Sequence, residues 1–349
     1  MNVAAIPDPK TTLMYAEAAD GGATLERQLA SNETLVKGLA QELRARPPRF
    51  VVSCARGSSD HAATFAKYLI ETELGLVTAS ASLSVSSVYA VPQGVEGALY
   101  LVISQSGRSA DLVRCAEAAR AGGARVVSLV NAEDSPLAAA SDTVIPLRAG
   151  SEKSVPATKS YLGSLTAILH LVAHWKRDER LMTALATTPA ALRQAFALDW
   201  SPLVAGLKDA KGMFVLGRGL GLGIAQEAAL KFKETCGLHA EAFSSAEVQH
   251  GPMALVGQGF PLLVFAQDDA TLEGSLATAR AFRSRGARVW TAAPGDEHAD
   301  ALPLAHAPHP LCEPLLEAQS FYRAVNALAL ARGLDPDMPP YLNKVTQTL

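Results

Sequence analysis

The sequence lacks features that mark several classes of protein. Its formal net charge is −3 over 349 residues, so no basic excess is present to attract nucleic acid. No apolar run approaches the roughly 20 residues needed to span a bilayer. The opening residues, MNVAAIPDPK, lack the basic segment and apolar run of a signal peptide. We therefore expect neither a nucleic-acid partner nor a membrane partner.

Cysteine is also scarce. The four cysteines are widely separated, with no C-x-x-C pair and no metal-ligand spacing. Free thiols indicate a reducing, cytoplasmic location. Apolar material is abundant, because 49% of the residues are hydrophobic and 19% are charged. This composition is typical of a globular protein with one large or two ordinary domains.

The two halves of the sequence resemble each other. Arg56–Gly57 recurs as Arg218–Gly219, and Leu101–Ser106 aligns with Leu263–Asp268, both at a shift of 162 positions. Several matches in order indicate a duplicated unit. Each unit alternates apolar runs with amphipathic helical patterns, which predicts an α/β fold with parallel sheets buried on both faces.

We predict five segments from these patterns. They are a helical lead-in at 1–48, a first α/β domain at 49–180, a helical linker at 181–210, a second α/β domain at 211–333 and a C-terminal segment at 334–349.

Serine-rich turns follow two predicted strands of the first half. Ser58 and Ser59 follow the first strand, and Ser104–Gln105–Ser106 with Ser109 follow the second. Ligands bind at the carboxyl ends of parallel strands, and hydroxyls before a helix can hold a phosphate or can serve only as caps. The aligned turn of the second half, Ala266–Gln267–Asp268, ends in a carboxylate. We therefore predict an anion site in the first half alone.

Charged side chains occur at helical spacing in the second half. Glu227, Lys231 and Glu234 share related helix faces, which fits either a surface ion pair or acid–base chemistry. The glycines of 217–223 do not match a dinucleotide fingerprint and indicate a close backbone approach instead. His170 and His174 lie four residues apart, but we found no carboxylate to complete a metal site. We predict no metal and no cofactor.

These strings carry a resemblance to a known family. Residues 229–234, 239–242 and 247–252, with 104–107, 155–159 and a tail from Asp335 to Thr346, resemble the tandem sugar-isomerase (SIS) family. The likeness is to the isomerase half of glucosamine-6-phosphate synthase and to standalone SIS-type glucosamine-6-phosphate deaminases. It implies two tandem SIS domains, each a doubly wound, flavodoxin-like parallel sheet flanked by helices.

The resemblance implies roles for individual residues, read at matching positions. The serine turns and Gln105 would hold the phosphate, and Val155 would line the sugar. Ala157 stands where the family usually has serine, and Arg56 is also not the synthase residue. The acid–base and amine roles fall on four residues: Glu234 as the base, His250 for ring opening, Lys231 beside the site and Lys344 for a Schiff base. His250 would reach the partner's site in a homodimer.

The expected reaction is metal-free deamination of glucosamine 6-phosphate to fructose 6-phosphate and ammonia. We expect this direction because the chain opens Met1–Asn2–Val3, without the glutaminase domain and its N-terminal cysteine. Three alternatives stay open. They are a deaminase or isomerase of galactosamine 6-phosphate or fructosamine 6-phosphate, an aminotransferase lacking its glutaminase, and a non-catalytic sugar-phosphate sensor.

Overall fold

The computed structural model describes residues 7–345, which divide into two compact units. The five-stranded unit comprises Ala23–Glu152, Lys159–Ala186 and the residues from Asn343 on. The four-stranded unit comprises the residues up to Gly22, Lys153–Thr158 and Thr187–Leu342. The predicted segment boundaries stay predictions.

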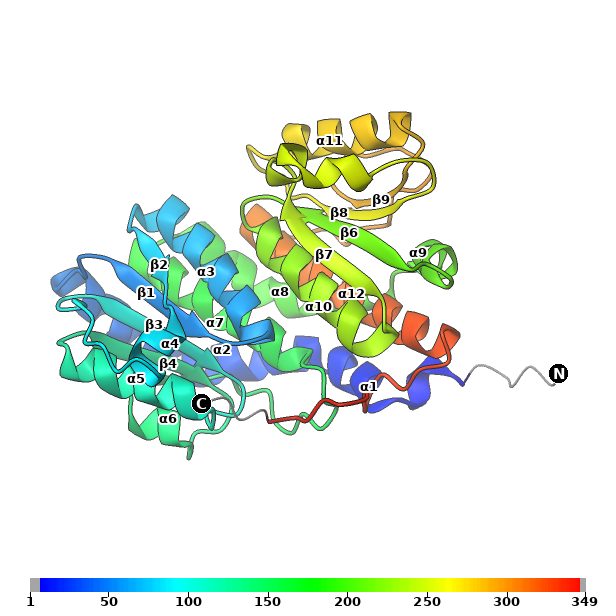
Figure 1. The fold of residues 1–349 in the computed structure, drawn as a ribbon. Coiled ribbons are helices and arrows are strands. Elements are labelled where there is room, and N and C mark those ends of the chain that lie inside the picture. Colours follow the sequence, from blue (N-terminus) through cyan, green and yellow to red (C-terminus); the bar gives the residue numbers. More distant parts are fainter. Residues whose placement is uncertain (1–6, 346–349) are drawn as a thin grey trace. The chain divides into compact units, whose positions relative to one another are not determined.

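The five-stranded unit contains one parallel sheet in the order β2-β1-β3-β4-β5, which is the flavodoxin-like order (Figure 1). Its strands are β1 (Val51–Ala55), β2 (Thr78–Ser80), β3 (Leu99–Ser104), β4 (Arg125–Val130) and β5 (Thr143–Pro146). Its helices are α3 (Ser58–Leu74), α4 (Leu83–Ser87), α5 (Ala110–Ala121), α6 (Pro136–Ala139) and α7 (Lys159–Lys176), with most of α2 (Gly21–Ala45) and the first part of α8 (Glu179–Ala197).

Helices cover both faces of this sheet because the strands are apolar on both faces. Val52 of β1 and Tyr100 of β3 pack in one buried cluster with Leu112 of α5. The intervening residues Val51 and Leu99 are equally buried and point to the opposite face. Helices α3 and α7 pack together over that second face. Polar side chains can therefore gather where the strands end and turns begin.

The four-stranded unit repeats the arrangement with one strand fewer, in the order β7-β6-β8-β9. Its strands are β6 (Gly212–Gly217), β7 (His239–Ser244), β8 (Pro261–Phe265) and β9 (Arg288–Ala292). Its helices are α1 (Leu13–Ala19), α9 (Ser201–Leu207), α10 (Gly221–Cys236), α11 (Leu272–Ser284) and α12 (Glu313–Ala331), with the short 3-10 helices η1 (Pro9–Thr11), η2 (Glu247–His250), η3 (Pro252–Leu255) and η4 (Pro310–Cys312).

Its sheet is also covered on both faces. Phe214 of β6 clusters with Phe282 of α11, whereas Phe265 of β8 meets Phe321 of α12 edge to face. In Figure 1, α11 lies on one side of this sheet and α10 with α12 on the other. Each fully buried phenylalanine contributes on the order of 1.5–3 kcal/mol through removal of apolar surface from water.

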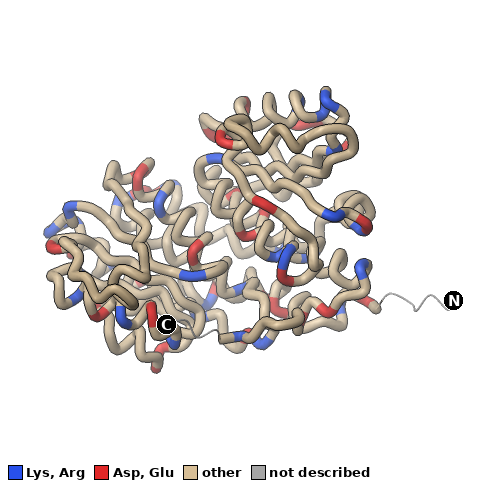
Figure 2. The backbone as a smooth tube through the Cα atoms, viewed as in Figure 1, with Lys and Arg blue, Asp and Glu red and all other residues tan. Residues whose placement is uncertain are grey.

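The distribution of charged residues and the state of the cysteines fit the expectations from the composition. Figure 2 shows Lys and Arg interspersed with Asp and Glu along the backbone of both units. The four cysteines are free and buried. Over residues 7–345, no helix is both long and apolar enough to cross a bilayer.

The glycines of the β6–α10 turn allow the strand and helix to approach closely. A Cβ at Gly217 would lie 2.2 Å from the carbonyl oxygen of Gly221, and a Cβ at Gly221 would lie 2.5 Å from Oε1 of Gln267. Both distances are far below van der Waals contact. These glycines therefore serve packing, as the sequence indicated.

We predict that Gly217→Ala destabilises the protein by about 1–3 kcal/mol, because the new methyl group meets backbone atoms that cannot rotate away. Gly212→Ala, at the other end of β6, is the matched control. There a Cβ would lie 3.6 Å from the His239 carbonyl oxygen, so we expect a change below about 0.5 kcal/mol. Urea denaturation followed by circular dichroism measures both, and equal midpoints for the two variants would contradict the steric argument.

Candidate functional site

The predicted serine turns lie side by side at the carboxyl edge of the five-stranded sheet. β1 and β3 are hydrogen-bonded neighbours. Ser58 and Ser59 open α3 directly after β1, and Ser104 ends β3. Ser109 is the N-cap residue of α5. Both turns therefore present hydroxyl side chains at the same edge.

The turn after β3 is held in a defined shape. The backbone N–H of Gly107 donates to Oγ of Ser104 at 3.1 Å, and that of Arg108 donates to Oγ of Ser106 at 3.3 Å. Gly107 has φ +61°, and a Cβ there would collide with Ser135 at 2.1 Å. The turn thus depends on glycine for both its backbone conformation and its packing. Gln105 and Ser106 remain half-buried beside it.

Neither N-cap residue of the two helices behind these turns forms a side-chain cap hydrogen bond. Ser109 makes none at the start of α5, and Gly57, the N-cap of α3, has no side chain. In the first turn of α5, Oδ1 of Asp111 accepts from the N–H of Leu112 at 2.8 Å. The first N–H groups of a helix need partners and carry partial positive charge. An uncapped pair of helix N-termini beside hydroxyls is suited to a phosphate.

Arg56 supplies a fixed positive charge at this edge. Its guanidinium contacts Oδ2 of Asp111 through Nε and Nη2, both at 3.0 Å. Asp111 is buried in the first turn of α5, whereas half of the Arg56 side chain is exposed. The pair neutralises a carboxylate that would otherwise repel an anion. This pairing joins residues 55 positions apart and could not be predicted from local spacing.

The corresponding edge of the four-stranded sheet is acidic. Gln267 follows β8 and donates to the buried Glu317 at 2.7 Å, while the N–H of Asp268 donates to Glu313 at 2.6 Å. Burial raises the pKa of Glu317 well above its usual range and the pKa of Glu313 to about 7. The two repeats therefore differ in the side chains at this edge, and the anion site in the first half stays a prediction.

Lys231 lies at the centre of a buried charge cluster on α10. Its Nζ is 2.6 Å from Oε2 of Glu234 and 3.3 Å from Oε1 of Glu227. The Tyr322 hydroxyl of α12 donates to Glu227 at 3.0 Å. Burial alone would lower the pKa of Lys231, but the two carboxylates raise it by more than burial lowers it. The net pKa is therefore raised, and the amine stays protonated. The surface ion pair considered for Lys231 and Glu227 is therefore wrong, because both side chains are fully buried.

Glu234 differs from the rest of this cluster in its exposure. One fifth of its side chain is open to solvent, whereas Lys231 and Glu227 are enclosed. A carboxylate held by a buried ammonium and open on one side can reach a substrate proton.

The other predicted residues lie in loops. His250 ends η2, is exposed and precedes Gly251, which has φ +139°. Val155 is half-buried and its N–H donates to the carbonyl of Asp337 at 2.9 Å. Ala157 is half-buried in the same short segment. The carboxylate of Asp337 also accepts the first N–H groups of α1, so the tail and α1 fix this segment together.

Lys344 pairs with a carboxylate that the sequence did not single out. Its Nζ lies 3.0 Å from Oε2 of Glu152, whose side chain is completely buried. Glu152 also accepts from the N–H and the hydroxyl of Ser160, at the start of α7. Because Glu152 follows β5, Lys344 lies at the carboxyl edge of the five-stranded sheet. No local spacing could reveal a pair separated by 192 positions.

The structure thus gathers the predicted residues into groups within each unit. The serine turns and Lys344 share one sheet edge of the five-stranded unit, and Lys231 with Glu234 form the cluster of the four-stranded unit. The catalytic and binding roles assigned to these residues stay predictions.

The fold is that of a tandem doubly wound α/β protein with two parallel sheets. A family model of the SIS domain matches residues 47–174 and 206–292. The chain therefore belongs to the SIS family and carries two SIS domains in tandem, which confirms the predicted family and fold class.

The chain is similar to curated proteins and to solved structures. The glutamine–fructose-6-phosphate aminotransferase of Zymomonas mobilis is 30% identical over 312 residues, covering 84% of this chain and 51% of that protein. The corresponding protein of Thermus thermophilus is 32% identical over 343 residues, covering 92% and 56%. The chain thus spans about half the length of these relatives.

Among solved structures, a Silicibacter pomeroyi protein provisionally named a phosphosugar isomerase matches with TM-score 0.89 and 41% identity, covering 93% of this chain and all of that one. The glucosamine-6-phosphate deaminase of Thermotoga maritima matches with TM-score 0.78 and 21% identity, covering 97% and 100%. The latter likeness shows the fold alone.

We predict that Lys231→Met destabilises the four-stranded unit by about 3–5 kcal/mol at neutral pH, because it leaves Glu227 charged and buried without its cation. The double variant Lys231→Met, Glu227→Gln removes that stranded charge and should recover part of the loss. Urea denaturation monitored by tryptophan fluorescence gives both values. A loss below about 1 kcal/mol in the single variant would contradict the buried cluster.

Proposed function

We propose that this chain is an amino-sugar-phosphate isomerase that acts as a deaminase. It converts glucosamine 6-phosphate and water into fructose 6-phosphate and ammonia. The observation that carries this proposal is the contrast between the two sheet edges. At one edge, serines adjoin two helix N-termini and the carboxylates of Asp111 and Glu152 are paired with Arg56 and Lys344; at the other, Glu313 and Glu317 accept hydrogen bonds from the turn after β8. The relatives named for fructose 6-phosphate support the substrate class.

The phosphate is assigned to the turns of the five-stranded unit. The hydroxyls of Ser58, Ser59 and Ser104 and the turn at Gln105–Ser106, with Ser109, supply donors for its oxygens. The N-termini of α3 and α5 add partial positive charge. Arg56 keeps Asp111 from repelling the dianion.

Glu234 is the proton-transfer base in this proposal. Its carboxylate removes the C2 proton of the open-chain aldose and returns it to C1, while one proton passes from the amine nitrogen to the C1 oxygen, which leaves an imine at C2. Water then adds to the imine carbon and ammonia departs, so atoms and charge balance. Lys231 is protonated and therefore positions Glu234 instead of accepting the proton.

Two further residues have conditional roles. His250 is exposed and exchanges the ring-opening proton, and a homodimer would bring it to the partner's substrate. An ammonium cannot attack a carbonyl, so a Schiff base at Lys344 requires its ion pair with Glu152 to open first. The same chemistry applies to galactosamine 6-phosphate or fructosamine 6-phosphate, with Val155 and Ala157 near the sugar.

A second candidate direction is supported by the relatives' names. These are aminotransferases, and the same proton transfer run in reverse makes glucosamine 6-phosphate from fructose 6-phosphate and ammonia. Incubation of the protein with fructose 6-phosphate and concentrated ammonium, followed by quantification of the amino sugar, measures this direction.

We predict ammonia release from at least one of the three hexosamine 6-phosphates and none from unphosphorylated glucosamine, because the phosphate provides the binding energy. Glu234→Gln should lower kcat by about 100-fold or more while calorimetry shows unchanged binding, since a general base contributes 10²–10⁴-fold. A coupled ammonia assay measures the rates.

Glu273→Gln, an exposed carboxylate on α11 that pairs with Arg280, is the matched control and should keep full activity. Binding of a hexosamine 6-phosphate without turnover in either direction would identify a sensor and reject the enzyme. Full activity in Glu234→Gln would reject Glu234 as the base but not the reaction.

A further inference from the structure

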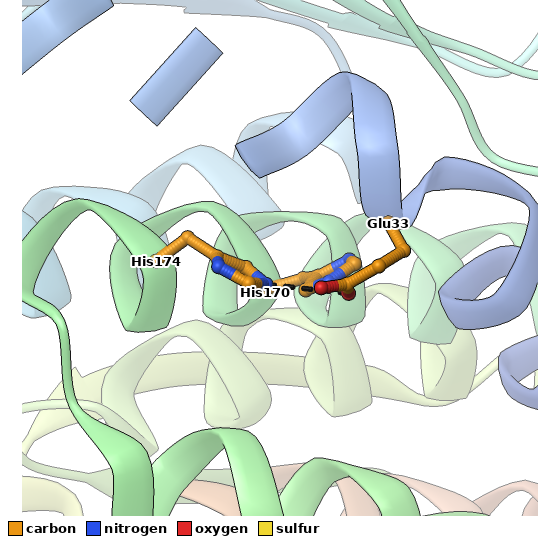
Figure 3. Close-up of side chains that lie close together, drawn as sticks. All are labelled: Glu33, His170 and His174. Carbon is orange, nitrogen blue, oxygen red and sulfur yellow. Dashed lines mark hydrogen bonds and ion pairs between the residues drawn. The ribbon is translucent and has the colours of Figure 1, made fainter. Parts of the chain in front are cut away.

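Three potential metal ligands meet on the helical face of the five-stranded unit. His170 and His174 come from α7 and Glu33 comes from α2, and the three side chains point toward one another (Figure 3). Oε2 of Glu33 lies 2.9 Å from Nε2 of His170 and 3.3 Å from Nε2 of His174. The sequence showed the histidine pair but not the carboxylate, which precedes His170 by 137 positions.

The spacing of these atoms suits a small transition-metal ion. Bonds of about 2.0–2.1 Å in a tetrahedral arrangement place neighbouring ligand atoms roughly 3.3 Å apart. All three ligand atoms lie within 4.8 Å of one another, so small side-chain rotations complete the geometry. Two imidazoles and one carboxylate form a donor set that zinc prefers.

The helices already hold these residues in place. His170 and His174 are one turn apart on one face of α7. Gln28, one turn before Glu33 in α2, donates to the carbonyl of Gly163 in α7 at 2.9 Å, and Asn32 donates to the carbonyl of Pro146 at 2.7 Å. The contact between α2 and α7 therefore exists without a metal, and a metal would bind a largely formed site.

The surroundings favour a bound ion with one open position. The His170 and His174 side chains are 4% and 11% exposed, whereas Glu33 is 54% exposed. A cavity of about 210 Å³ adjoins them, lined also by Leu29, Met182 and Leu185. The cavity leaves space for a water molecule as the fourth ligand.

This cluster is separate from the serine turns. His170 lies eleven residues after Lys159, the first residue of α7, which is about 16 Å along the helix axis. The start of α7 contacts Glu152 at the carboxyl edge of the sheet. A metal at His170 would therefore link α2 to α7 and would not take part in phosphate binding.

We propose that Glu33, His170 and His174 form a binding site for a divalent transition metal of the zinc class, with three protein ligands and one water. Its role is to link α2 and α7. Within the described residues, the buried Nδ1 of His170 has no hydrogen-bond partner. A metal-bound histidine usually donates its other ring N–H to a hydrogen-bond acceptor, which His170 lacks. We therefore expect moderate affinity for the metal.

The test uses the full chain, free of affinity tags and stripped of metal by chelator. Isothermal titration with Zn²⁺ should show one site per chain, and Co²⁺ should give the visible absorption of a four-coordinate complex. Saturating Zn²⁺ should also raise the melting temperature, because a ligand that binds the native state stabilises it. His174→Ala and Glu33→Gln should each weaken Zn²⁺ binding at least about 100-fold.

Glu33→Gln keeps a hydrogen-bond acceptor for both histidines, so it tests the carboxylate ligand without disrupting the fold, which circular dichroism verifies. His306→Ala, an exposed histidine of the four-stranded unit, is the control and should bind Zn²⁺ as the parent does. Absence of stoichiometric binding in the parent would leave a hydrogen-bonded cluster only and overturn the proposal. Binding that persists in both ligand variants would overturn it equally.

Discussion

The chemistry of this protein depends on one constraint: each parallel sheet is buried on both faces. Residues such as Val51 and Val52 alternate between two apolar layers, so polar side chains within a strand would lose their water without gaining partners. Inside a strand, a buried polar side chain such as Ser53 relies on a backbone partner, here the Ala79 carbonyl at 3.4 Å, whereas the strand ends open into turns that lead to helix N-termini. A duplicated scaffold therefore offers two equivalent edges at which binding can evolve.

The two edges carry different polar side chains on the same backbone plan. At one, Ser104 and Ser106 accept hydrogen bonds from the backbone of their own turn, which fixes their oxygens while the hydroxyl protons can point outward. At the other, Gln267 binds the buried Glu317. Because burial raises the pKa of that acid, it costs least as a neutral group. The two edges therefore differ in the polar groups that they offer to a ligand.

The central strands could be predicted because apolar runs in both halves align, whereas the edge strands could not. β2 has only three residues. In β7, polar and apolar residues alternate as His239–Ala240–Glu241–Ala242, so neither strand shows an apolar run. The serine turns were visible because they adjoin strands. The burial of Lys231 could not be predicted, because charged residues spaced three or four positions apart occur equally on an exposed helix. Glu33 and Glu152 join their partners only through tertiary packing.

Both lysines singled out by the sequence are held by buried carboxylates, and this limits what each can do. Lys231 has two carboxylates and full burial, so removing its proton would strand negative charge in an apolar interior; it acts as a fixed cation that orients Glu234. Lys344 pairs with the fully buried Glu152, while its own side chain is a quarter exposed. Separating the pair would leave the Glu152 carboxylate in the interior without this cation, which is unfavourable. The ion pair therefore opposes any reaction that requires Lys344 as a neutral amine.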